Sequence, residues 1–425
     1  MNRDVVLIGA GKIARGYVGQ LFSAEGWRVT YVHHRMEFVR GLRNRGYYTL
    51  YQHDHDGGCK TLRMEGYDVL CSVEEREAYL DALARAQYAG VVTFPGAFDG
   101  IAADLAAAVR LRMERGVEEP LAILLCVNTV DPAEFFYNRI SEYLDESARA
   151  YFDRHVGLVE TLVTRLCSTP SPEQLLEDPY AVSTSDTPIL EVDREAFLPG
   201  HSYPEFFLLG ENVPGKLVKK IWCGNLEHCC LAYYGQYFGH GYVHEAARDP
   251  YVRRCTYYAG QEANRAVAAA YGFSPEEMAF DVPAKWQRSM KGLVPDPLTR
   301  VGADPVRKLG KNDRFIGPAL LSLQQGNLPV FIAKGAACGF YFHNPEDAGA
   351  RTVQAHIQER GIGSAIQTFC GLDPAHPQEG LLYQLILSSY EELSQFCLLY
   401  TSQSALILPM MWWTRLRPWT PGAWL

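Results

Sequence analysis

The sequence predicts an α/β domain followed by a mainly α-helical domain. A chain of 425 residues is too long for one ordinary hydrophobic core, so at least two domains are expected. Short apolar runs alternate with helical patterns in the first half, as in an open parallel sheet, and from Lys216 onward the pattern is helical. We expect a first domain with a connecting segment over 1–215, a second over 216–400, and a tail over 401–425.

Composition excludes several classes of protein. The chain is 48% hydrophobic and carries a net charge of −9 with dispersed Lys and Arg, which argues against a nucleic-acid partner. No apolar run reaches about 18 residues, so no membrane partner is expected. Eleven scattered Cys without a CxxC pair indicate mostly buried thiols in a reducing cytoplasm, and we expect no targeting segment before the first strand. The expected partner is a small-molecule substrate.

The first predicted strand, Val5–Ile8, leads into a glycine-rich turn and a helical pattern over 17–24. In a dinucleotide site the first glycine makes the turn, the second admits the pyrophosphate, and the final alanine lets helix and strand pack closely. This context favours a Rossmann-type domain; the alternative is a glycine-rich turn without a ligand. The GxGxxA pattern consists of Gly9, Ala10, Gly11, Lys12, Ile13 and Ala14.

The second predicted strand, Arg28–Val32, ends without the acid that usually binds the 2′-hydroxyl of NAD. His33, His34 and Arg35 follow it, which puts potential cations where a 2′-phosphate would lie. The expected cofactor is NAD, with NADP possible through His33 and Arg35. The alternative is that these residues form a solvated loop and the ribose is held otherwise.

Two further buried strands are predicted at Ala89–Pro95 and Pro120–Val127. They place Thr93, a candidate cofactor contact, and Asn128 near their carboxyl ends, where open α/β sheets bind ligands. Asn128 is a candidate to hydrogen-bond substrate, although a turn-forming Asn would have the same position. Another strand is expected at His155–Leu166, and the segment 168–215 is interpreted as a connection between domains.

The polar loop 53–58 has the composition of a metal site, but adjacent ligands in a glycine-ended loop usually form only a hairpin tip. We expect a hairpin and no metal. Residues 46–75 as a whole are predicted to form short strands and turns.

The stretch 216–234 is predicted to be a largely apolar helix that carries Lys220, Asn225 and His228 on one broad face. At about 100° per residue, Asn225 lies about 140° from Lys220 and His228 about 80° from it. A Lys in apolar surroundings has a lowered pKa and can act as a base near neutral pH. The alternative is a surface Lys, a capping Asn and a hydrogen-bonded core His.

Further helices are predicted at 241–247, 250–270, 275–291, 315–324, 345–361 and 380–400. Between them, the segment 300–314 is dense in Lys and Arg. Such a segment can hold an anion, or it can be a solvated loop.

Taken together, these motifs resemble the polyol-specific long-chain dehydrogenase (mannitol dehydrogenase) family. The Lys-x4-Asn-x2-His element is fairly specific for that family, whereas the glycine motif alone is a weak signal. The matching stretches fall in the family's order over roughly residues 4–400: the glycine turn 9–16, Cys126–Asn128, Val156–Glu160, Lys220–His228 and Arg300–Pro318.

The resemblance implies metal-independent hydride transfer with a nicotinamide cofactor. In that picture Lys220 is the general base, and Asn128 and Asn225 hold the developing alkoxide. His228 would orient the polyol, while Arg300 and Lys308 match substrate-contacting positions. Arg307 and Arg314 are phosphate candidates that we add.

The run 307–318 favours the sugar-phosphate branch, which interconverts D-mannitol 1-phosphate and D-fructose 6-phosphate. A free-polyol (mannitol 2-) dehydrogenase or a hexuronate reductase would share the Lys, Asn and His chemistry without needing phosphate cations. A non-catalytic nucleotide-binding sensor is a third reading, although a sensor has no use for a buried base.

The chain departs from the family pattern at three places. His33 stands where an acid is usual, and Thr164 replaces the Asp of a Val-Asp-Arg element that ends here in Arg165. The tail after about residue 400 matches nothing, and we expect its deletion to leave activity intact.

Overall fold

The computed structural model describes residues 3–54, 56–278 and 296–401. The chain divides into two compact units, Met1–Val218 and Lys219–Leu425. The tail beyond residue 401 and most of the helix expected at 275–291 lie outside the described residues. None of the described helices combines the length and the apolar character needed to cross a membrane.

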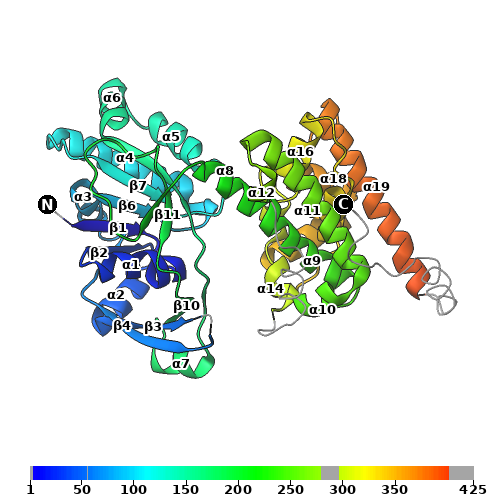
Figure 1. Ribbon diagram of the computed structural model, residues 1–425, viewed down its shortest axis with the longest axis horizontal. Helices are drawn as coiled ribbons and strands as arrows, with labels where there is room; N and C mark the ends of the chain where they lie inside the picture. The colour runs from blue at the N-terminus through cyan, green and yellow to red at the C-terminus, as the bar shows by residue number, and fades with distance from the viewer. Residues whose placement is uncertain (1–2, 55, 279–295, 402–425) are drawn as a thin grey trace. The chain divides into compact units, whose positions relative to one another are not determined.

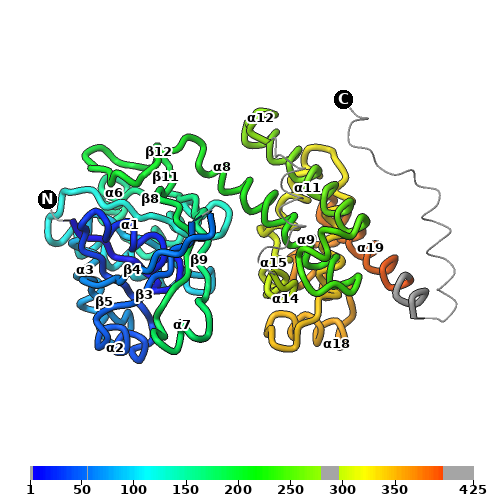
Figure 2. Tube along the Cα trace, turned by 60° about the horizontal axis from the view of Figure 1, so that its bottom comes forward, coloured from blue at the N-terminus to red at the C-terminus, as the bar shows by residue number. Residues whose placement is uncertain are grey.

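The first unit is built on an eight-stranded sheet with the order β12-β11-β8-β7-β6-β1-β2-β5 (Figure 1). The six strands from β8 to β5 run parallel, whereas β11 is antiparallel to β8 and pairs in parallel with β12 at one edge. Figure 2 shows β12, β11 and β8 next to one another. The strands are β1 (Asp4–Ile8), β2 (Arg28–His33), β5 (Asp68–Cys71), β6 (Tyr88–Val91), β7 (Leu121–Leu125), β8 (Val156–Leu162), β11 (Leu190–Asp193) and β12 (Phe207–Gly210).

Helices cover both faces of this sheet, which explains why its strands are continuous apolar runs. In β1 the side chains of Val5 and Leu7 join one hydrophobic core, and those of Val6 and Ile8 join the other. This arrangement confirms the predicted Rossmann-type α/β fold. One face is covered by η1 (Ala14–Val18), α1 (Gly19–Ala24) and α2 (Met36–Arg45), and the other by α3 (Arg76–Arg85), α4 (Phe98–Glu114), α5 (Pro132–Glu142) and α6 (Glu146–His155).

A second sheet, with the order β4-β3-β10-β9, packs beside η1. Its hairpin turn is closed by Asp54, whose Oδ1 accepts from the backbone N–H of Gly58 at 2.7 Å. The loop 53–58 is therefore a hairpin tip, as predicted, and the described residues contain no cluster of His, Cys, Asp or Glu arranged to hold a metal. The strands are β3 (Tyr47–His53), β4 (Cys59–Glu65), β9 (Cys167–Ser168) and β10 (Val182–Ser185).

The interpretation of 168–215 as a connection was wrong. The segment contributes β10 to the second sheet and β11 and β12 to the first, with α7 (Pro172–Glu177) between β9 and β10. These strands span only four residues each and lie among prolines and turn residues, so the sequence gave no clear strand signal. The segment ends in α8 (Val213–Val218), which packs on β8 and β11.

The second unit is mainly helical, as predicted, and α11 packs against α9, α16 and α17. The helix expected at 216–234 is divided into α8, a π-helical turn η3 and α9. The helix α17 was not predicted. The elements are η3 (Lys219–Asn225), α9 (Leu226–Tyr237), α10 (Val243–Arg248), α11 (Pro250–Tyr271), α12 (Pro275–Met278), α14 (Leu298–Gly302), α15 (Pro305–Lys308), α16 (Ile316–Gln324), α17 (Val330–Gly339), α18 (Ala348–Cys370) and α19 (Pro377–Thr401).

Candidate active site

The carboxyl ends of four adjacent parallel strands bring the candidates of the first unit to one edge of the sheet. Asn128 follows β7, Thr93 follows β6, Gly9 follows β1 and His33 ends β2. Successive strands leave β1 in opposite directions, towards β2 and towards β6, so this edge includes the topological switch point. Dinucleotides bind at such points.

The glycine turn fits a dinucleotide. Gly9 has φ of 108°, and a Cβ there would collide with the carbonyl oxygen of Val92. A Cβ built on Gly11 instead meets no atom within 4 Å, so the backbone beside it is open to a pyrophosphate. Thr93 adjoins the turn, because its Cβ is 3.5 Å from the Cβ position built on Gly9. Ala14 is fully buried against the sheet, as its role in close packing requires.

Two buried guanidinium groups hold the helix that follows the turn, and sequence reasoning assigned neither of them this role. Arg15 donates from Nε to the carbonyl oxygen of Ala10 at 2.8 Å and from Nη1 to that of Tyr180. Arg165, the residue after Thr164, donates to the carbonyl oxygen of Gly16 at 3.1 Å. Burial lowers the pKa of both groups. They tie the glycine turn and η1 to segments from far along the chain.

His33 is not one of the cations expected after β2. Its ring stacks on those of His34 and Phe38, with centroids 4.6 and 4.3 Å away, and its Nδ1 accepts from the backbone N–H of Arg35 at 3.1 Å. Burial, together with the charges of His34 and Arg35, lowers the pKa of His33 to about 4. The ring is therefore neutral at pH 7, and the expectation of a charged His33 is corrected.

The loop that carries Asn128 is fixed by two side chains of β8. Thr161 donates to the carbonyl oxygen of Leu125 at 3.0 Å, and Glu160 accepts from the backbone N–H of Ala133 at 3.2 Å. Asn128 itself is exposed between these two anchors. Burial raises the pKa of Glu160 to about 7. The sequence showed Glu160 only as part of a matching strand, and its burial at the loop had no sequence signal.

In the second unit, Lys220 and Asn225 lie on the π-helical turn η3, and His228 lies on α9. In a π-turn the hydrogen bond joins residues five apart, so Lys220 and Asn225 share a face more closely than in a regular α-helix. Such turns frequently occur at functional sites. Burial lowers the pKa of Lys220 to about 8. The structure thus gives this amine the property that a general base near neutral pH needs.

Asp296 connects His228 to Arg300. Its Oδ2 is 3.6 Å from Nε2 of His228, and its carboxylate receives two hydrogen bonds from Arg300, at 2.7 and 2.6 Å. Burial alone would raise the pKa of Asp296, but hydrogen bonds from His228 and Arg300 lower it to about 2. The sequence analysis missed this residue, since an Asp between two prolines has no spacing relation to the Lys-x4-Asn-x2-His element.

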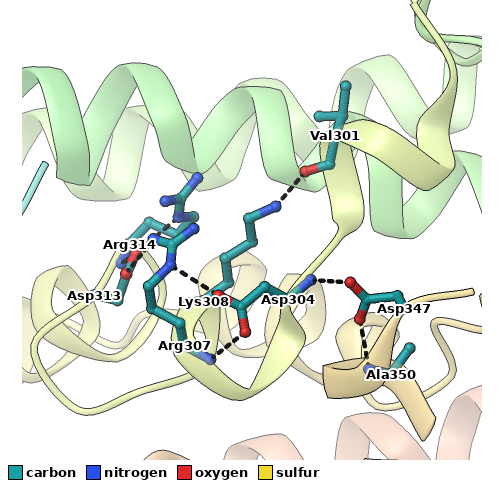
Figure 3. A network of polar contacts seen from close by, with 8 residues as sticks. All are labelled: Val301, Asp304, Arg307, Lys308, Asp313, Arg314, Asp347 and Ala350. Carbon is teal, nitrogen blue, oxygen red and sulfur yellow. Dashed lines mark hydrogen bonds and ion pairs between the residues drawn. The ribbon is translucent and has the colours of Figure 1, made fainter. Parts of the chain in front are cut away.

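The other candidate cations of the second unit form an internal network (Figure 3). Arg307 pairs with Asp304 at 3.0 Å and with Asp313 at 3.1 Å, and Arg314 pairs with Asp313 at 2.8 Å. Lys308 is buried and donates to the carbonyl oxygen of Val301 at 2.6 Å. Burial lowers the pKa of Lys308 to about 8.

The network adjoins the helix that carries His228. The charges of Lys308 and Arg314 act on the thiol of Cys229, the residue after His228. In addition, Trp222 of η3 donates to the carbonyl oxygen of Asn312 at 3.2 Å. The structure therefore brings Lys220, Asn225, His228 and the basic segment into one region of the second unit.

A Rossmann-type unit with an open glycine turn, followed by a helical unit with a partly buried amine of lowered pKa, defines a nicotinamide-dependent dehydrogenase. The chain belongs to the mannitol dehydrogenase family. Residues 3–197 match the model of the mannitol dehydrogenase Rossmann domain, and residues 217–368 match that of the mannitol dehydrogenase C-terminal domain.

The chain is similar to curated relatives and to solved structures over most of its length. It is 28% identical to mannitol-1-phosphate 5-dehydrogenase of Bacillus velezensis, over 88% of this chain and 97% of that protein. It is also 28% identical to the enzyme of the same name from Brevibacillus brevis, over 89% of this chain and 96% of that protein. Mannitol 2-dehydrogenase of Pseudomonas fluorescens, solved with NAD and D-mannitol, superposes with a TM-score of 0.71 at 16% identity, covering 93% of this chain and 92% of that chain. This likeness shows a shared fold.

Proposed function

We propose that the protein interconverts D-mannitol 1-phosphate and D-fructose 6-phosphate with a nicotinamide cofactor. The observation that carries the proposal is the position of Lys220, a partly buried amine with a pKa of about 8 on a π-turn that also carries Asn225. The relatives named mannitol-1-phosphate 5-dehydrogenase support this choice of substrate.

In the oxidative direction the neutral amine of Lys220 accepts the proton of the reacting hydroxyl and becomes an ammonium group. The bound cofactor supplies the chemistry of hydride acceptance from the carbinol carbon. The amide N–H groups of Asn225 stabilise the oxygen as negative charge develops on it, and Asn128 is the second amide that we propose for this role. In the reverse direction the ammonium returns the proton to the carbonyl oxygen.

The open glycine turn supports cofactor binding, which we assign to the segment 9–14 together with Thr93. The substrate is assigned to His228, Arg300 and Lys308. Arg300 has five N–H donors, of which two bind Asp296, so the remaining donors suit hydroxyl or phosphate oxygens. Arg307 and Arg314 are weaker phosphate candidates, because Asp304 and Asp313 already balance their charge.

The same ion pairs favour a second candidate, a free-polyol dehydrogenase. If the charges of Arg307 and Arg314 serve only the internal network, fewer cations remain for a phosphate. A hexuronate reductase is a related alternative, since Arg300 and Lys308 also suit a carboxylate.

The test compares reduction of fructose 6-phosphate, fructose and keto-uronates under the same conditions. We expect kcat/KM for fructose 6-phosphate to exceed that for fructose by at least a hundredfold. Replacing Lys308 with Met should reduce that ratio, whereas Lys311→Met should leave it unchanged, because the charge of Lys311 is balanced by Glu379 at 2.7 Å. Equal rates with and without phosphate would contradict the proposal and support the free-polyol alternative.

A further inference from the structure

The end of β2 differs chemically from a site built for NAD. The adenosine ribose of a bound dinucleotide lies at this position, and an acid there accepts a hydrogen bond from its 2′-hydroxyl. Residues 33–36 of this chain contain no acid, and the first carboxylate is that of Glu37, in the first turn of α2. The position thus lacks the anionic acceptor that selects NAD.

The groups present are hydrogen-bond donors. Because Nδ1 of His33 accepts the backbone N–H of Arg35, the neutral ring carries its proton on Nε2, which can only donate. The stacked rings of His34 and Phe38 hold this imidazole in place. A phosphate oxygen is purely an acceptor and matches such a donor.

Positive charge also collects at this end of β2. The charges of His34, Arg35 and Arg15 all act on the ring of His33. Arg15 bonds to the backbone carbonyl oxygens of Ala10 and Tyr180 rather than to a carboxylate. Within the described part of the chain, no carboxylate forms an ion pair with Arg35. The charge of Arg15 is already partly balanced by Asp178, so an anionic group placed here would chiefly balance the charge of Arg35.

We propose that Arg35, His34 and the Nε2–H of His33 bind the 2′-phosphate of NADP(H), so that this protein prefers NADP(H) to NAD(H). The inference rests on the proposed nicotinamide-dependent function and specifies its cofactor. The arginine supplies charge and several N–H donors for the phosphate oxygens. Its place just after the carboxyl end of β2 makes Arg35 a residue that determines cofactor specificity.

Binding measured without sugar tests the inference separately from catalysis. Dissociation constants of NADPH and NADH are obtained by calorimetry, and adenosine 2′,5′-bisphosphate is compared with 5′-AMP as a fragment probe. We expect NADPH to bind at least tenfold more tightly than NADH, and the bisphosphate more tightly than 5′-AMP. Arg35→Ser should raise the dissociation constant of NADPH at least tenfold and change that of NADH less than twofold. His33→Asp should strengthen the binding of NADH relative to that of NADPH.

Arg40→Ser is the matched control, since Arg40 is an exposed arginine of the same helix whose paired carboxylate, Glu74, is 3.9 Å away. It should change neither constant. Tighter binding of NADH, or an equal loss of both cofactors in Arg35→Ser, would overturn the inference and leave the dehydrogenase proposal standing. If neither cofactor binds, the proposed function fails as well.

Discussion

The imidazole of His228 lies 3.6 Å from the carboxylate of Asp296, and the same carboxylate receives two hydrogen bonds from Arg300. One acid therefore holds two side chains that we assign to the substrate. Because the pKa of Asp296 is lowered to about 2, the acid stays ionised throughout the physiological range. It can fix the orientation of both partners without taking part in proton transfer.

Replacing Asp296 with Asn should disturb substrate binding through His228 and Arg300. Hydrogen bonds to charged groups contribute about 1.5–3 kcal/mol, so we expect kcat/KM for the sugar to fall roughly 10- to 100-fold. Most of the loss should appear in KM, and the dissociation constant of the cofactor should not change. Steady-state kinetics and calorimetry measure the two quantities. The control is Glu379→Gln, which removes the ion pair with Lys311 in the same unit. A variant within twofold of the parent would show that Asp296 does not position these residues.

Lys220→Ala should abolish turnover while the fold and cofactor binding remain. Removal of a proton-transfer group costs about 10²- to 10⁴-fold in rate, and the loss should appear in kcat. The neighbouring lysine offers a matched control, because Lys219 lies on the same π-turn but donates to the backbone carbonyl oxygen of Glu277. Lys219→Ala should retain activity within a fewfold. Near-full activity of the Lys220 variant would exclude this amine as the base.

The pH dependence of the two reaction directions should be opposite. Oxidation needs the neutral amine of Lys220, so its rate should rise as pH increases through about 8, the lowered pKa of that group. Reduction needs the ammonium form, so its rate should fall over the same range. The measurement is kcat/KM for both directions from pH 6 to pH 10.

Lys308 has a similarly lowered pKa, of about 8, and needs a separate control. Lys308→Arg keeps a permanent positive charge, so any inflection that persists in this variant does not come from Lys308. Inflections that shift away from about 8 in the arginine variant would assign the titration to Lys308 instead.

The sequence was sufficient to predict the Rossmann-type fold of the first unit and the conformation of its glycine turn, because local patterns determine both. A β-branched run, two glycines and a small residue specify the turn at Gly9 and Gly11 by steric rules that need no distant partner. The carboxyl ends of parallel strands then place Thr93 and Asn128 on the same edge without further information. The helical character of the second unit followed in the same way from its periodicity.

The features that the sequence did not predict depend on tertiary partners. A rotation of 100° per residue assumes a regular α-helix, so the π-turn that changes the relation of Lys220 to Asn225 had no signal. The density of Lys and Arg in 300–314 likewise suggested an anion site, but Asp304 and Asp313 form ion pairs with Arg307 and Arg314. The number of Lys and Arg residues in a segment therefore does not give the positive charge available to a ligand, because ion pairs with Asp and Glu balance part of it.

Glu160 should make the stability of the first unit depend on pH. Burial raises its pKa from 4.5 to about 7, the backbone N–H of Ala133 opposes the shift, and Asp131 and Asp193 add to it. A folded-state pKa above the unfolded value means that the folded protein binds more protons between these limits. Stability is therefore fully present below pH 4.5 and is lost as pH rises to about 7, by an upper bound of about 3 kcal/mol.

Glu160→Gln removes this titration and keeps an oxygen that can accept from Ala133. We expect the free energy of unfolding of the parent protein to decrease between pH 5 and pH 8 by more than that of the variant, as measured by urea unfolding. Glu142→Gln serves as the control, because Glu142 is an exposed partner of Arg139 in the same unit and should leave the difference unchanged. Equal pH dependence in the parent and Glu160→Gln would show that the buried carboxyl is not the group that titrates. A flattened dependence would establish that the loop bearing Asn128 is held by an acid whose ionisation opposes folding.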